Sequence, residues 1–154
     1  MKPLLVIGLG NPLMGDDGIG WHVAERLAGD PRLPDSVEVT SGGTDLLRLA
    51  GQIEGRSRVV VIDASIDAIR DAGDVGRISA FDEDLPDGRQ QHAHHLSAVQ
   101  AIGLLRMITH VHFTLLGISV SSAAMDSQLS PALAARMPAI LDRVLQELLC
   151  TSSK

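Results

Sequence analysis

Short apolar runs recur along the chain, and the segments between them have apolar residues at helical spacing. The runs are short, and they are either continuously apolar or alternating, which is the pattern of β-strands. They are Leu4–Gly8, Val37–Thr40, Arg58–Ile62, Val75–Ile78 and Val111–Ile118. The fourth run is the weakest of these patterns. We expect the third strand to end at Asp63, where the apolar run stops.

Apolar residues three or four positions apart predict a helix in most of the intervals between these runs. This spacing covers Ile19–Leu27, Leu46–Leu49, Leu96–Leu105 and Leu133–Leu148. Thr44 can cap the second of these helices. The last helix has a strong start signal, because the capping hydroxyl of Ser130 is followed by Pro131 at the first helical position. Pro138 lies inside the same pattern and is a position for a kink.

Alternating strands and amphipathic helices predict an α/β fold. We expect a three-layer αβα domain of the phosphorylase/hydrolase-like type, with a mostly parallel central sheet of about five strands. The 154 residues suit one domain spanning 1–154. In sheets of this kind, ligands bind at the carboxyl ends of the strands, so residues just beyond each strand are the best candidates for function.

Composition narrows the choice of partners. The formal net charge of -6 argues against a nucleic acid or an anionic membrane surface as a partner. The single cysteine, Cys150, cannot form an intramolecular disulfide or a two-cysteine metal clip. No apolar run reaches the ~20 residues of a membrane helix. We therefore expect a cytoplasmic protein that binds neither nucleic acid nor membrane.

The first strand leads into a glycine-rich loop, GLGNPLMGDDG, and glycine-rich loops in this position commonly bind phosphate groups. Its spacing fails as a dinucleotide fingerprint, because Leu13 occupies the position of the last glycine. It also fails as a Walker loop, because Asp16 and Asp17 replace the lysine and the hydroxyl residue. Carboxylates at those positions would repel phosphate, so the loop favours a cation instead.

Three groups of residues could supply ligands for such a cation. They are Asp16 and Asp17 after the first strand, Asp63 after the third, and the cluster His92, His94 and His95 before a helix. Carboxylates and imidazoles suit a first-row metal such as nickel or zinc. Structural alternatives stay open: the aspartates of the loop can cap a helix, Asp63 can bond loop amides, and the histidines can lie in a solvated loop.

The remaining residues give little support to other chemistry. His22, His110 and His112 are expected to be structural, since each stands alone in or beside a predicted element. The segment Gly117–Ser121 fails as a GxSxG nucleophile motif at its last position. Cys150 is far along the chain from the histidine cluster, so nucleophilic catalysis is not favoured.

Together these residues resemble the [NiFe]-hydrogenase maturation endopeptidases. That family opens with a strand and a GxGNxLxxD(D/E)GxG loop, which Gly8–Gly20 matches throughout. A GGT follows the second strand, here Gly42–Thr44, and an Asp ends an aliphatic strand, here Asp63. A His then begins a helix, and His94 is the best match. The resemblance runs in order through nearly the whole chain.

The resemblance implies an aspartic-type, metal-dependent endopeptidase that removes a C-terminal extension from the precursor of the hydrogenase large subunit. The metal is nickel, presented by the precursor rather than permanently bound, and no other cofactor is implied. The catalytic and metal-contacting residues would be Asp17, Asp63 and His94, with His95 as the alternative ligand and Asp16 in support. We expect the enzyme to be a monomer.

The chain departs from the family pattern at two places. Ser41 replaces an aspartate before the GGT, and Ile118–Ser121 replaces a Glu-Pro pair after Gly117. These departures bear on which hydrogenase is matched.

Three alternatives remain. The first is a non-catalytic nickel-binding assembly partner, and the second is a peptidase with resident zinc. The third is a peptidyl-tRNA hydrolase-like esterase, which shares the letters GLGNP but continues with residues that this chain lacks.

Overall fold

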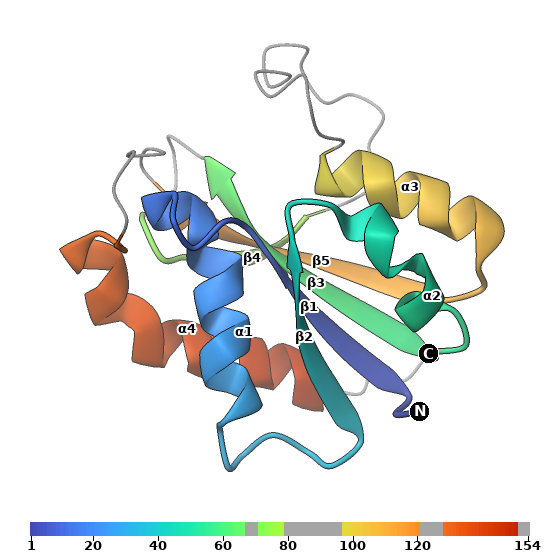
Figure 1. Cartoon of the computed structure of the whole chain (residues 1–154). Helices are drawn as coiled ribbons and strands as arrows, with labels where there is room; N and C mark the ends of the chain where they lie inside the picture. The colour runs from blue at the N-terminus through green and yellow to red at the C-terminus, as the bar shows by residue number, and fades with distance from the viewer. Residues whose placement is uncertain (67–70, 79–96, 121–127, 151–154) are drawn as a thin grey trace.

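A five-stranded sheet forms the centre of the protein, in a computed structural model that describes residues 1–66, 71–78, 97–120 and 128–150. The strands lie in the order β2-β1-β3-β5-β4 (Figure 1). Their bounds are β1 Leu4–Leu9, β2 Val37–Gly43, β3 Arg58–Ile66, β4 Val75–Ile78 and β5 His112–Val120. All neighbouring strands are parallel except β4, which pairs antiparallel with β5 at one edge. The prediction of a mostly parallel sheet is confirmed.

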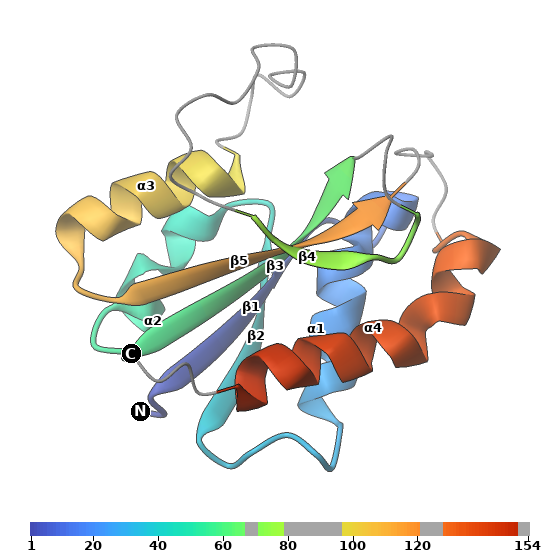
Figure 2. The ribbon, with the colours of Figure 1, turned by 180° about the vertical axis from the view of Figure 1, so that it is seen from behind.

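Helices cover both faces of this sheet (Figures 1 and 2). On one face lie α1, Ile19–Ala28, and α4, Pro131–Leu149. On the other lie α2, Ala50–Ile53, and α3, Ala98–Ile108. Short 3-10 turns, η1 Gly15–Gly18 and η2 Leu46–Leu49, precede α1 and α2. This is the three-layer αβα arrangement that the sequence predicts.

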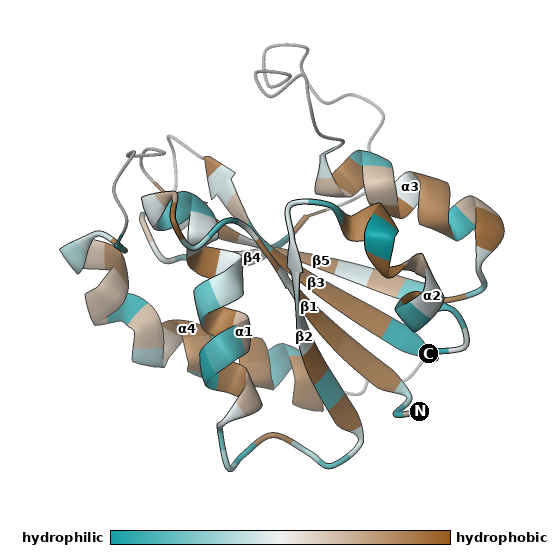
Figure 3. Cartoon of the chain, viewed as in Figure 1, coloured by the Kyte–Doolittle hydropathy of each residue, from teal (hydrophilic) through white to brown (hydrophobic). Residues whose placement is uncertain are grey.

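The core is divided in two by the sheet, because successive side chains of a strand point to opposite faces. In β3, Val60 and Ile62 pack with α1 and α4, whereas Val59 and Val61 pack with α2 and α3. All of these side chains are fully buried. The central strands are accordingly apolar along most of their length (Figure 3). A continuous apolar run such as VVVI is therefore the mark of a strand covered on both sides.

Some predicted boundaries are wrong. The third strand does not end at Asp63: β3 continues to Ile66, because its pairing with β5 extends from Arg58–His112 to Ile66–Val120. Thr44 does not cap the following helix. Asp45 does so instead, and its carboxylate accepts a hydrogen bond from the backbone N–H of Leu47 at 3.1 Å.

Two expectations about the later helices are also settled by the structure. The helix α3 begins at Ala98, after the cap Ser97, so the start of the predicted Leu96–Leu105 helix moves by two residues. The last helix runs through Pro138 without ending there, and its N-terminus is capped by Ser130, as predicted. Within the described ranges, no helix combines the length and apolar character needed to cross a membrane.

Candidate active site

The two aspartates expected to act together, Asp17 and Asp63, lie at the carboxyl edge of the parallel strands. Asp17 belongs to η1, which follows β1 and packs against β3. Asp63 lies in β3 directly after its fully buried residues. The negative charge of Asp17 raises the pKa of Asp63, so the two carboxylates are close enough to repel each other. The structure thus brings together two of the three groups predicted to converge.

Two glycines make this approach possible. A Cβ on Gly20 would lie 2.4 Å from the carbonyl oxygen of Ile62, and a Cβ on Gly8 would lie 2.2 Å from that of Gly20. The first turn of α1 therefore runs against the backbone of β1 and β3, close to where η1 and β3 carry Asp17 and Asp63. Sequence reasoning missed this role of Gly20. The available signal was a glycine inside a helical pattern, which can mark a packing or functional requirement.

The surroundings of Asp63 change its proton affinity. Its side chain keeps some exposure, but the protein around it displaces most of the water that would solvate a carboxylate. This desolvation raises the pKa of Asp63 from 3.8 to about 7, against a lowering by the backbone N–H of Ala64, which donates to Oδ1 at 2.8 Å. The charge of Asp17 adds to the rise. A carboxyl group that titrates near neutral pH can accept or donate a proton during catalysis.

Asp16 has a different environment from Asp17. Its side chain is only 4% exposed, and its Oδ1 accepts a 2.7 Å hydrogen bond from the backbone N–H of Ser130. Ser130 is the N-cap of α4, so this bond ties the loop after β1 to the start of the last helix. Negative charge is also stabilised at a helix N-terminus. The geometry favours the structural interpretation of Asp16 over a role as catalytic base.

A pair of substitutions at Asp16 separates these two interpretations. Asp16→Asn keeps an oxygen that can accept from Ser130, so peptide cleavage should fall by no more than about tenfold, below the roughly 10²–10⁴-fold contribution of a general base. Asp16→Ala leaves the part-buried N–H of Ser130 without this acceptor and should lower the free energy of unfolding by about 1–3 kcal/mol. Kinetics and urea denaturation of both variants test this. A hundredfold loss in Asp16→Asn with unchanged stability would show that Asp16 is the base.

The predicted histidine ligands, His94 and its alternative His95, lie outside the described residues, as does His92. The described chain resumes at Ser97, whose Oγ accepts from the backbone N–H of Gln100 at 3.2 Å. Because α3 leads into β5, which runs parallel to β3, α3 begins at the same sheet edge as Asp63 (Figure 1). Among the described residues, no three His, Cys, Asp or Glu side chains are arranged to hold a metal ion.

The other histidines have the structural positions expected of them. His22 is partly buried in α1, and its burial, together with the charge of Arg26, lowers its pKa. Its ring is nearly perpendicular to that of Trp21, at 89° and a centroid distance of 5.1 Å. His110 and His112 are exposed at the start of β5.

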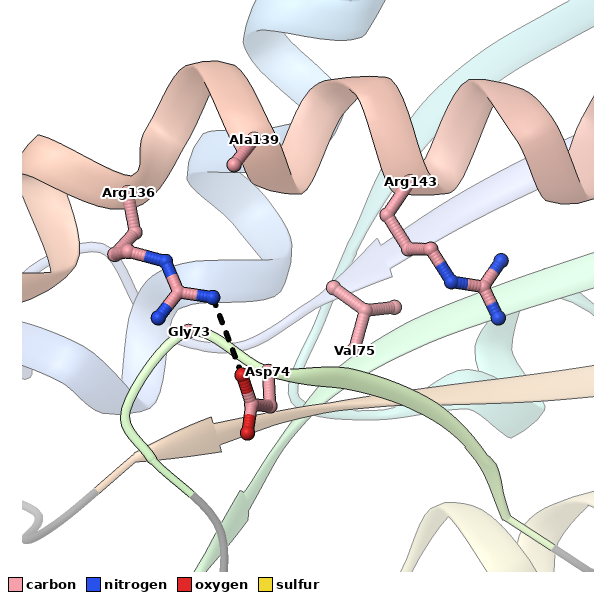
Figure 4. Close-up of a pocket in the computed structure, with 6 residues that line it drawn as sticks. All are labelled: Gly73, Asp74, Val75, Arg136, Ala139 and Arg143. Carbon is pink, nitrogen blue, oxygen red and sulfur yellow. Dashed lines mark hydrogen bonds and ion pairs between the residues drawn. The ribbon is translucent and has the colours of Figure 1, made fainter.

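A surface groove of about 390 Å³ lies between α4 and the segment leading into β4 (Figure 4). It is lined by Gly73, Asp74, Val75, Arg136, Ala139 and Arg143. An ion pair of 3.1 Å joins Arg136 to Asp74, and one of 2.7 Å joins Arg143 to Glu147. The first of these pairs fastens the edge of the sheet to α4. Neither Asp17 nor Asp63 lines the groove, so it is separate from the candidate active site.

The model of the HycI family, described as hydrogenase maturation protease, matches residues 21–147. The chain belongs to the hydrogenase maturation protease family. The match includes Asp63 and His94 and begins after Asp17. The protein is therefore a hydrolase of peptide bonds, and neither the non-catalytic partner nor the peptidyl-tRNA hydrolase is favoured.

Individual relatives agree with this membership of the hydrogenase maturation proteases. The hydrogenase 2 maturation protease of Escherichia coli is 29% identical over 149 residues, which cover 94% of this chain and 90% of the relative. The solved structure of the hydrogenase maturating endopeptidase HybD from E. coli matches with a TM-score of 0.73 and 27% identity, over 97% of this chain and 93% of that one. The maturation protease HycI from Thermococcus kodakarensis, at 21% identity, has the same fold. Its TM-score is 0.77 over 96% of this chain and 92% of that one.

Proposed function

We propose that this protease removes the C-terminal extension from a nickel-loaded precursor of the [NiFe]-hydrogenase large subunit, acting in the cytoplasm as a monomer. The observation that carries the proposal is the coupled pair Asp17 and Asp63, held at the carboxyl edge of the sheet in a member of this family. Two adjacent carboxylates repel each other unless a proton or a cation lies between them. The precursor would supply that cation.

The donor set fits a first-row metal. Asp17 and Asp63 would supply oxygen ligands, and His94, or His95 in its place, would supply an imidazole nitrogen. A metal held there by a small number of protein ligands keeps open positions and supplies a Lewis acid that polarises a carbonyl group. Nickel belongs to the substrate in this proposal, so the enzyme itself contributes the ligands that recognise it.

The aspartates also prepare the site for proton transfer. With its pKa raised to about 7, Asp63 can hold a proton in the free enzyme near neutral pH and release it when a cation approaches. A carboxylate of the pair can then take a proton from the attacking water and give it to the leaving amine. The close packing of Gly20 on the backbone of β1 and β3 sets the position of the turn that carries Asp17 relative to β3.

The test is cleavage of the purified precursor, prepared with and without nickel. We expect the full chain to shorten the nickel-loaded precursor and to leave the nickel-free precursor intact, as shown by mass spectrometry of both products. Equal cleavage of the two precursors would overturn nickel recognition. Tightly held zinc in the purified enzyme, together with chelator-sensitive cleavage of unrelated peptides, would establish a resident-zinc peptidase instead.

The same assay distinguishes the two candidate histidines. His94→Ala should reduce cleavage of the nickel-loaded precursor by about a hundredfold or more, as expected when one ligand of a small set is removed. His95→Ala should retain activity within a few fold and serves as the neighbouring control. The reverse result would assign the ligand to His95, and full activity in both variants would remove histidine from the proposed site.

A further inference from the structure

The turn between β1 and η1 has an apolar tip, which we define as Pro12, Leu13 and Met14. Leu13 is 73% exposed and Met14 is 37% exposed, although both are large hydrophobic residues. They lie in the loop that leads directly to Asp17. An exposed apolar side chain is common on protein surfaces and needs no explanation by itself. Two further observations separate this tip from an ordinary surface position.

The first observation is that the turn is held rigidly. The side chain of Asn11 accepts a hydrogen bond from the backbone N–H of Leu13 at 2.9 Å, and its carbonyl oxygen accepts from the N–H of Met14 at 3.0 Å. Pro12 between them has its φ angle fixed by its ring. The exposure of Leu13 is therefore imposed by the backbone. A side chain presented in this way loses little backbone entropy when a partner covers it.

The second observation is that the tip is packed against Asp17 itself. The backbone N–H of Asp17 donates to the carbonyl oxygen of Met14 at 3.2 Å. A Cβ on Gly18 would lie 2.5 Å from the carbonyl oxygen of Asn11 and 2.9 Å from the Cα of Pro12. The loop before the tip and the residues after it thus form one compact unit. The apolar tip and Asp17 therefore belong to the same backbone unit.

The chain offers a contrasting patch on α3. Leu104, Met107 and Ile108 are 45%, 81% and 71% exposed at helical spacing. These residues lie on a helix of the opposite layer from α1 and have no backbone link to Asp17. Met107, at 81%, is more exposed than Leu13 and provides a control of the same apolar chemistry.

We propose that Leu13, supported by Met14, is a docking residue that contacts an apolar side chain of the precursor beside the peptide bond that is cut. The inference rests on the proposed function, since it names a contact for that substrate. Leu13 carries no group for proton transfer or metal binding, so its contact is made equally in the bound ground state and in the transition state. Loss of such a contact raises KM and leaves kcat unchanged.

The experiment compares Leu13→Ser with Met107→Ser, each as the full chain, on the nickel-loaded precursor. Leu13→Ser should raise KM about tenfold, the effect of losing one buried apolar contact, with kcat within about twofold. Met107→Ser should match the wild type in both constants. Leu13→Met, which restores an apolar side chain, should recover most of the lost affinity. Thermal unfolding should be unchanged in all three variants, because the replaced side chains are exposed.

The outcomes separate this inference from the function on which it rests. A wild-type enzyme that fails to cut the precursor overturns the proposed function. If the wild-type enzyme cuts the precursor but Leu13→Ser has the same KM as the wild type or as Met107→Ser, only the docking role is overturned. A fall in kcat at unchanged KM also overturns docking, because Leu13 would then act by positioning Asp17.

Discussion

Replacing Asp63 with asparagine should abolish cleavage and, at the same time, stabilise the free protein above neutral pH. Cleavage should fall by about a hundredfold or more, because a side-chain amide at this position can neither carry the negative charge nor transfer a proton. The free energy of unfolding at about pH 8 should rise by on the order of 2–4 kcal/mol, since the folded chain no longer has to hold a desolvated carboxylate. Asparagine keeps the oxygen that accepts from the N–H of Ala64.

The sign of this effect follows from the raised pKa of Asp63. The pKa is about 7 in the folded protein, against 3.8 as the ordinary value. Between these two pH values the folded state binds a proton that the unfolded chain has released, so stability falls as pH rises from about 4 to about 7. Above about pH 7 the ionised Asp63 lowers the stability of the folded state by its full amount. The advantage of Asp63→Asn should therefore be large at about pH 8 and absent below about pH 4.

Urea denaturation at several pH values, followed by circular dichroism, measures this difference. The exposed Asp35 supplies a matched control, and Asp35→Asn should change stability by less than about 0.5 kcal/mol at every pH. If Asp63→Asn is no more stable than the wild type at about pH 8, Asp63 does not bear the desolvation that the structure indicates. If it is more stable but fully active, its charge is dispensable for cleavage.

An aspartate whose pKa is raised by desolvation is better explained by function than by folding. A buried structural polar group normally gains hydrogen bonds that offset its lost hydration. Among the described residues, the N–H of Ala64 donates to Asp63, whereas the field of Asp17 opposes the ionisation of Asp63. Residues of this kind cluster at sites where binding or catalysis uses the stored energy. A cation arriving with the precursor would stabilise the ionised Asp63 and so offset the unfavourable energy of its desolvation.

Much of the fold is readable from the sequence because each element has a local signal. The run VVVI in β3 is apolar on both faces of the sheet, and the pair Ser130-Pro131 is a helix start that needs no tertiary context. Strand ends are less readable. The stretch Asp63–Ile66 breaks the apolar run, yet it remains in β3 because β5 supplies backbone partners for it. Local sequence carries no information about that pairing.

The residue types of the candidate site could be read from the sequence, but their physical state could not. The replacement of lysine by Asp16 and Asp17 in a glycine-rich loop led to the prediction of a cation in place of a phosphate, which stays a prediction. The difference between these two neighbours was not predictable, because it arises from the N–H of Ser130, 114 positions away in the chain. The raised pKa of Asp63 depends likewise on what surrounds it in space.

The second large effect is expected at Gly20, where a single methyl group should destabilise the fold and reduce cleavage together. The Cβ of alanine there would lie 2.2 Å from the carbonyl oxygen of Leu9 and 2.4 Å from that of Ile62. Both atoms belong to the backbone of central strands, so α1 must move away from the sheet. We expect the free energy of unfolding to fall by about 2–4 kcal/mol and the melting temperature by roughly 5–15 °C.

Gly103 in α3 provides the matched control, because a Cβ there meets no atom within 4 Å. Gly103→Ala should raise the free energy of unfolding by about 0.5–1 kcal/mol, the usual gain when alanine replaces glycine inside a helix. The two variants add the same methyl group to a helix, so opposite signs isolate the contact of α1 with β1 and β3. Gly20→Ala should also weaken cleavage at temperatures where it remains folded, because displacement of α1 moves the preceding turn η1, and with it Asp17, away from Asp63. Normal cleavage by a destabilised Gly20→Ala would mean that the spacing of the two carboxylates does not set the rate.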